Sequence, residues 1–232
     1  MSLCAFDIVG FDLDGTLVDT AEDLTAAVNA VLLGEGAPAL AVTTVRSMIG
    51  GGGRAMLAHA LDASNLDPGR LDALYPVMLE ACAGAVCVHS RPFAGAVDVL
   101  DWARECALEV AVVTNKTEGL ARALLDALDL SSRFTCIIGG DTLGPGHCKP
   151  DPAPLHAMVE QCGGGRAVFV GDSHFDITAA RAAGIASVLC RFGYLTQPTE
   201  LYGADAIIDE FADLPGLLEA WPVPRVAGLV AA

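Results

Sequence analysis

Short apolar runs rich in valine and isoleucine recur along this chain, and stretches with helical patterning lie between them. Such a run is typical of a parallel strand that is covered on both faces, and the helices between the strands serve as crossover connections. The expected strands are 7–11, 110–114, 135–138, 167–170, 187–190 and 206–208. The expected helices between them are 96–106, 119–128, 154–161 and 177–183. The alternation predicts an α/β fold in which a parallel sheet lies between two helical layers.

The predicted Rossmann-like three-layer core leaves one long segment unexplained. A strand-helix-strand unit takes about 30 residues, far fewer than separate Asp12 from Thr114. The additional segment has helical patterns at 21–33, 43–48, 54–61 and 69–85. We therefore predict a small α-helical cap domain, 18–92, inserted into a core domain made of 1–17 and 93–232. The connections between them are expected near 17–20 and 90–95.

Composition excludes several classes of partner. The 232 residues include 29 acidic and 13 basic side chains, and the formal net charge is −16, which repels nucleic acid and anionic membranes. No apolar stretch reaches the roughly 18 to 20 residues of a membrane-spanning helix, and Met1 to Phe11 lacks the features of a signal peptide. The eight cysteines form no Cys-x-x-Cys pair and are expected to be reduced core residues. A cytoplasmic location follows as an expectation.

Polar side chains follow the expected strands at the points where the strands end. They are Asp12, Asp14 and Thr16 after the first, Thr114, Asn115 and Lys116 after the second, and Asp172, Ser173 and Asp176 after the fourth. Lys149, which with Lys116 makes up all the lysine of the chain, precedes a proline-rich helix start. Open parallel sheets bind ligands outside the carboxyl ends of their strands, so we expect these clusters to meet at one site.

Asp12 and Asp14 are the strongest chemical signal among these residues. Side chains two apart on a strand project to the same face, so the two carboxylates can converge on one metal ion. A calcium-binding EF-hand loop is excluded, because it needs a glycine and a glutamate where this chain has Leu17 and Asp23. For this motif taken alone, a turn in which Asp14 and Thr16 only bind local backbone stays an alternative.

Four segments, FDLDGTLVDT, VVTNK, CKPDP and VGDSHFD, resemble in sequence and in order the four motifs of the haloacid dehalogenase superfamily. The resemblance extends from Asp7 to about Cys190 and includes a helical cap between the first and second motifs. Within the superfamily, the chain looks most similar to the phosphoglycolate phosphatases. This resemblance implies a magnesium-dependent phosphatase that hydrolyses a small phosphorylated metabolite, above all 2-phosphoglycolate.

The resemblance also implies a role for each core motif residue. Asp12 would attack phosphorus and form an aspartyl phosphate. Asp14 would protonate the leaving alkoxide and then deprotonate the water that hydrolyses the intermediate. Thr114 would bind a phosphate oxygen, and Lys149 would neutralise the charge shared by the phosphate and Asp12. Asp172 would complete a magnesium site with an oxygen of Asp12 and the backbone carbonyl of Asp14.

Three further residues are expected around this centre. Asp176 would lie in a second layer, where it orients Lys149 or a metal-bound water, and direct coordination of the metal by Asp176 is left open. Thr16 and Asn115 would help to position the substrate.

The cap has one unusual stretch, the glycines 50–53 followed by Arg54. The stretch fails as a nucleotide-binding fingerprint, because no strand precedes it and Ala55 stands where the last glycine would be. It forms either a flexible turn between helices or a loop in which the amides of Gly52 and Gly53 and the side chain of Arg54 approach a substrate carboxylate.

Single residues decide between the activities known in the superfamily. A dehalogenase lacks the second aspartate of the first motif, so Asp14 argues against it, and a phosphonate hydrolase of this type needs a cap lysine, which 18–92 lacks. A hexose-phosphate mutase and phosphatases of sugar phosphates, nucleotides or pyrophosphate stay open. A binding protein without activity is disfavoured, because all four motifs are intact. A monomer or a homodimer is expected, and the apolar tail 221–232 could pack on the core or make a dimer contact.

Overall fold

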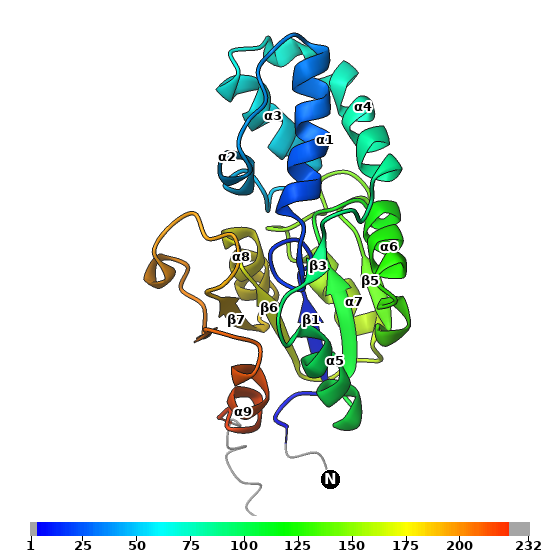
Figure 1. Ribbon diagram of the computed structural model, residues 1–232. Coiled ribbons are helices and arrows are strands. Elements are labelled where there is room, and N and C mark those ends of the chain that lie inside the picture. Colours follow the sequence, from blue (N-terminus) through cyan, green and yellow to red (C-terminus); the bar gives the residue numbers. More distant parts are fainter. Residues whose placement is uncertain (1–3, 223–232) are drawn as a thin grey trace, which may run out of the picture.

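A six-stranded parallel sheet forms the centre of the computed structural model, which describes residues 4–222 (Figure 1). Its strands follow the order β5-β4-β1-β6-β7-β8. They are β1 (Ile8–Phe11), β4 (Glu109–Val113), β5 (Cys136–Ile138), β6 (Ala167–Gly171), β7 (Ala186–Cys190) and β8 (Ala206–Ile208). The α/β prediction is confirmed, and every predicted strand agrees with the structure to within one residue at each end.

Helices cover both faces of this sheet, because alternate strand residues point to opposite sides. Val9 and Phe11 belong to one apolar cluster, while Ile8 belongs to another. The first cluster includes α5 (Ala96–Glu105), α6 (Glu118–Ala127) and α9 (Asp213–Glu219), and the second includes α7 (Ala153–Gln161) and α8 (His174–Ala183). Short 3₁₀ turns occur at η1 (Pro68–Arg70), η2 (Ser131–Arg133) and η3 (Thr199–Leu201). The predicted three-layer core is thus present, and α9 is a helix that the sequence analysis did not predict.

Four helices follow β1 and form a separate region above the sheet in Figure 1. They are α1 (Ala21–Gly34), α2 (Val42–Arg46), α3 (Gly53–Ala63) and α4 (Leu71–Gly84). Their apolar side chains form a cluster of their own around Leu32, Leu57, Leu61 and Met78. The segment predicted as one helix at 69–85 instead begins with the turn η1, where Pro68 stands at the first position and the Asp67 carboxylate accepts a hydrogen bond from the Gly69 N–H. No helix among residues 4–222 combines the length and hydropathy that a membrane span requires.

The two connections to the helical region lie side by side. The strand β2 (Val18–Asp19) pairs in antiparallel fashion with β3 (Arg91–Pro92). Next to them, the Asp23 carboxylate accepts hydrogen bonds from the backbone N–H groups of Val88, His89 and Ser90. Although burial acts to raise it, the pKa of Asp23 is lowered by these bonds and by the Ser90 hydroxyl. Both strands fall inside the connections predicted near 17–20 and 90–95, and the division into a cap at 18–92 and a core stays a prediction.

Candidate active site

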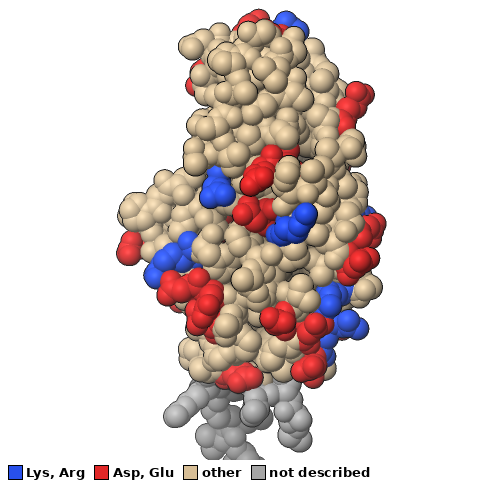
Figure 2. All heavy atoms as spheres, viewed as in Figure 1, with Lys and Arg blue, Asp and Glu red and all other residues tan. Residues whose placement is uncertain are grey.

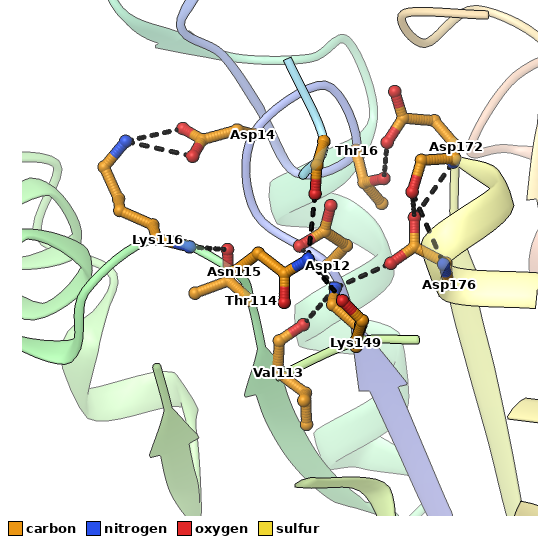
Figure 3. Close-up of polar contacts among 12 residues, drawn as sticks. Asp12, Asp14, Thr16, Val113, Thr114, Asn115, Lys116, Lys149, Asp172 and Asp176 are labelled. Carbon is orange, nitrogen blue, oxygen red and sulfur yellow. Dashed lines mark hydrogen bonds and ion pairs between the residues drawn. The ribbon is translucent and has the colours of Figure 1, made fainter. Parts of the chain in front are cut away.

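The carboxyl ends of the three central strands, β4, β1 and β6, lie side by side at one edge of the sheet. The strand β1 pairs with β4 on one side and with β6 on the other, so the direction of winding reverses at β1, where open parallel sheets bind ligands. Asp12, Thr114 and Asp172 each directly follow one of these strands. Figure 3 shows the three side chains around one centre, together with Lys149 from the loop before α7.

Lys149 is a buried cation between two carboxylates. Its Nζ donates hydrogen bonds to Asp12 Oδ1 at 2.8 Å, to Asp176 Oδ1 at 2.6 Å and to the carbonyl oxygen of Val113 at 2.7 Å. The side chain is only 1% exposed. Burial alone would lower the pKa of Lys149, but the charges of Asp12 and Asp176 raise it above the usual lysine value. Lys149 is therefore charged and holds the Asp12 carboxylate in place.

Asp176 is positioned by the start of α8. Its Oδ2 accepts hydrogen bonds from the N–H of Ser173 at 2.9 Å and from the Ser173 hydroxyl at 2.6 Å. Ser173 caps the first turn of the helix in return. With its other oxygen on Lys149, Asp176 has both oxygens occupied by protein donors.

Asp172 is a buried carboxylate without a cationic partner among the described residues. Its Oδ1 accepts from the Thr16 hydroxyl at 2.9 Å, and its Oδ2 accepts from the Tyr194 N–H at 2.7 Å. Burial, with the charges of Asp176 and Asp12, raises the pKa of Asp172 well above the ordinary aspartate value. The backbone at residue 15 can lie this close to Asp172 only because the residue is glycine. Its φ is +91°, and an added Cβ would lie 2.4 Å from Asp172 Oδ2.

The carboxylates of Asp12, Asp172 and Asp176 could together bind a metal ion. Each offers an oxygen, these oxygens lie within 4.8 Å of one another, and all three side chains are buried. Burial raises the pKa of Asp12 to about 7 against the opposing charge of Lys149. One ammonium cannot balance three buried carboxylates, and ionised carboxylates out of water need a cation. The donor set and its uncompensated charge therefore fit a hard divalent cation.

Asp14 points away from this cluster, into a pocket between the sheet domain and the helical region. Lys116 Nζ donates to Asp14 Oδ1 at 2.8 Å and to Oδ2 at 3.0 Å (Figure 3). The side chains of Lys116 and Asp14 are 9% and 12% exposed. The sequence analysis gave Lys116 no role of its own, and the structure makes it the partner of Asp14. The one available signal was that both lysines of the chain fall within the motifs.

Thr114 and Asn115, which follow β4, line the same pocket. Asn115 Nδ2 donates to the carbonyl oxygens of Gly50 and Lys149, each at 2.9 Å, so one side chain bridges the glycine-rich loop and the core. Thr114 is buried, and its hydroxyl accepts from the Lys116 N–H at 3.2 Å. Both residues line the pocket, as expected for side chains that contact a substrate.

The glycine-rich loop lies at the pocket, but Arg54 does not. Gly52 and Gly53 line the pocket at the start of α3. The Arg54 side chain is 53% exposed, forms an ion pair with Asp72 on the outer surface, and lies with its guanidinium 5.8 Å from the centre of the Tyr75 ring. Arg54 is therefore not among the residues that line the pocket, and its approach to a substrate stays a prediction.

Tyr194 links the metal-site candidate to the start of the helical region, and no sequence signal pointed to it. While its N–H binds Asp172, its hydroxyl accepts from the N–H groups of Thr20 at 2.7 Å and Ala21 at 3.0 Å and donates to Asp19 Oδ1 at 2.6 Å. Burial and Asp19 raise the pKa of the Tyr194 phenol, which therefore stays protonated.

We expect Tyr194→Phe to lower the free energy of unfolding by about 1–2 kcal/mol, because the Thr20 N–H loses its acceptor and the Ala21 N–H and the Asp19 carboxylate keep only their mutual bond at 3.4 Å. Urea denaturation measures this. Tyr202→Phe is the matched control, because the Tyr202 hydroxyl accepts one backbone N–H, from Thr196 at 3.0 Å, and we expect a smaller loss there. A Tyr194→Phe loss no greater than that of the control would contradict a linking role.

Charge is uneven over the surface of the molecule. Figure 2 shows acidic side chains gathered where the helical region meets the sheet domain, with basic side chains on either side of them. An anionic ligand approaching this junction meets an opposing field, so it needs local cations to bind.

Comparisons with known proteins agree with this geometry. Residues 9–190 match the family model described as haloacid dehalogenase-like hydrolase. A phosphoglycolate phosphatase of Caulobacter vibrioides is 42% identical over 225 residues, which cover 94% of this chain and 94% of the relative. A phosphoglycolate phosphatase of Agrobacterium fabrum is 38% identical over 214 residues, covering 90% and 91%.

The fold has a counterpart among solved structures. The crystal structure of a predicted phosphoglycolate phosphatase from Haemophilus somnus superposes with a TM-score of 0.85 at 30% identity and covers 92% of this chain and 98% of that one. The matched range contains the motif residues Asp12, Thr114, Lys149 and Asp172, which the structure brings together at the ends of the central strands. The chain therefore belongs to the haloacid dehalogenase-like hydrolases.

Proposed function

We propose that the protein is a magnesium-dependent phosphatase of small phosphate monoesters and that 2-phosphoglycolate is its substrate. The observation that carries the proposal is the buried cluster of Asp12, Asp172 and Asp176 around Lys149, with Asp12 and Asp14 both lining the adjoining pocket. Relatives named phosphoglycolate phosphatase, 42% and 38% identical over nearly their full length, support the choice of substrate.

Each residue has a chemical task in this proposal. Asp12 attacks phosphorus and forms an aspartyl phosphate, while Asp14 protonates the leaving alkoxide and later takes a proton from the hydrolytic water. Lys149 neutralises charge beside Asp12, and Thr114 binds a phosphate oxygen. Asp176, with both oxygens occupied, keeps Lys149 in place.

The buried carboxylates of the site are suitable ligands for a magnesium ion. Asp12, Asp172 and the backbone carbonyl of Asp14 would hold it, and when bound it would supply positive charge to the phosphate. Thr16 would then orient Asp172 through its hydroxyl rather than contact the substrate directly, because that hydroxyl already donates to Asp172.

Phosphate release from 2-phosphoglycolate tests the proposal. We expect turnover with Mg²⁺, loss of turnover with EDTA, and recovery when Mg²⁺ is restored. Asp172→Asn should weaken the apparent affinity for magnesium by more than about tenfold, because one charged ligand is lost. Asp126→Asn, which changes an exposed carboxylate on α6, is the matched control. Equal activity of the two variants at limiting magnesium would refute the metal assignment, and no turnover of any small phosphate monoester would refute the function.

A further inference from the structure

We infer that Lys116 binds a carboxylate carried by the leaving group and so makes the enzyme selective for phosphate esters of 2-hydroxy acids. The inference rests on the proposed phosphatase function and adds to it the residue that selects the substrate.

The first argument is the chemistry of the pocket wall. Within the described part of the chain, the side chains around the pocket from the helical region are mainly apolar, namely Leu24, Ile49, Met56, Tyr75, Met78, Leu79 and Cys82. Among residues 4–222, Lys116 is the single basic residue that lines this pocket. A second anionic group on the substrate would enter beside Asp14 in a strongly acidic protein, so it would be repelled unless Lys116 met it.

The second argument is the capacity of the ammonium group. A lysine has three N–H donors, and the structure uses two of them on Asp14. One donor is thus left for a ligand in the pocket that Lys116 lines, and the charge of the ammonium can serve both carboxylates. The N-terminus of α3, where Gly52 and Gly53 line the same pocket, adds a partial positive charge to the pocket.

The third argument is distance along the substrate. Asp14 is the proposed proton donor to the bridging oxygen, and Lys116 Nζ lies 2.8 Å from Asp14 Oδ1. In an ester of a 2-hydroxy acid, the carboxylate is attached to the carbon that carries the bridging oxygen. A substrate whose bridging oxygen meets Asp14 therefore presents its carboxylate to the neighbouring Lys116.

The sequence suggested Arg54 for this task. Arg54 does not line the pocket, and its charge is paired with Asp72 on the exposed surface. Lys116 instead stands on the loop after β4, in the core that also holds the reacting groups.

Two substrates that differ in one group test the inference: 2-phosphoglycolate and 2-hydroxyethyl phosphate, in which CH₂OH replaces the carboxylate. We expect the wild type to prefer 2-phosphoglycolate in kcat/KM by roughly 10- to 100-fold, the range for a hydrogen bond between charged groups. In Lys116→Gln, this preference should fall to near one, even if loss of the Asp14 partner slows both substrates. Lys116→Arg should retain most of the preference. The control Arg70→Gln, which removes a surface ion pair with Glu35 in the helical region, should leave the preference unchanged.

The outcomes separate this inference from the proposed function. A wild type that hydrolyses both esters equally is a phosphatase but has no carboxylate site, which overturns the inference without any variant. An unchanged preference in folded Lys116→Gln overturns it as well, as does a preference abolished by Arg54→Gln and not by Lys116→Gln. If the wild type hydrolyses neither ester nor any other small phosphate monoester, the proposed function itself fails.

Discussion

Asp12→Asn should reduce kcat for phosphate release by at least about 10⁴-fold, the loss typical when a covalent nucleophile is removed. The amide oxygen of asparagine is a poor nucleophile, and it carries no charge to balance Lys149. Steady-state assays at saturating Mg²⁺ measure the loss, and a burst of product in the first turnover should also vanish.

The same substitution should leave the fold intact, which makes the result a test of chemistry. Lys149 keeps its ion pair with Asp176, and burial raises the pKa of Asp12 even beside Lys149, so the ionised form of Asp12 is held at a cost. We therefore expect Asp12→Asn to unfold at a urea concentration near that of the wild type. A folded Asp12→Asn enzyme with a rate within about tenfold of the wild type would rule out the aspartyl phosphate.

The sheet could be predicted from the sequence because its strands are short and apolar, and all but the edge strand β8 are largely buried. Three elements could not. The strands β2 and β3 are two residues each, too short to show periodicity. The helix α9, with proline and glycine in its sequence DLPGLLE, has weak helical propensity. It forms because Leu214 and Leu218 are buried against the sheet, which is a tertiary effect.

The core of the site could be predicted for a related reason. The parallel topology carries Asp12, Thr114 and Asp172 to one edge, so their meeting follows from the order of the strands. Contacts on the leaving-group side depend instead on packing between distant segments. Lys116 meets Asp14 across 102 positions, and Tyr194 meets Asp19 across 175. Nothing local to either residue indicates its partner.

The direction of the Arg54 side chain could not be predicted from the sequence either. The place of Arg54 at the start of a helix beside four glycines suggested a ligand-binding group, but the direction of its side chain depends on the exposed Asp72 and on the ring of Tyr75, both on α4. A sequence indicates which residue types are present near a site more readily than the direction in which a long side chain leaves the backbone.

Lys149→Met should impair both stability and activity. Methionine fills a similar space, but it leaves Asp12 and Asp176 buried without their shared counter-charge, which typically costs about 3–5 kcal/mol of the free energy of unfolding. We also expect kcat to fall by about 10³-fold, because the phosphate and Asp12 lose the charge that stabilises the transition state. Urea denaturation and steady-state kinetics give the two values, and a variant with the stability of the wild type would contradict the assigned role.

The double variant Lys149→Met with Asp176→Asn separates the two effects. Removing one of the two uncompensated carboxylates should restore part of the stability, since the asparagine oxygen can still accept from Ser173. It should restore no activity, because Asp12 still lacks the ammonium. A double variant less stable than Lys149→Met would show that Asp176 stabilises the fold by other means.

The loss of stability caused by Lys149→Met should depend on pH in a predictable direction. The pKa of Lys149 is raised in the folded protein, so its stabilising contribution is fully present below the ordinary lysine value of 10.5 and is lost only as the pH rises through the higher folded value. Across neutral pH the wild type therefore keeps this contribution. In the variant, the uncompensated carboxylates can take up protons as the pH falls, which removes their buried charge. We expect the stability difference between the two proteins to shrink from about pH 8 to about pH 5, and a difference that grows on acidification would show that uncompensated carboxylate charge does not cause the defect.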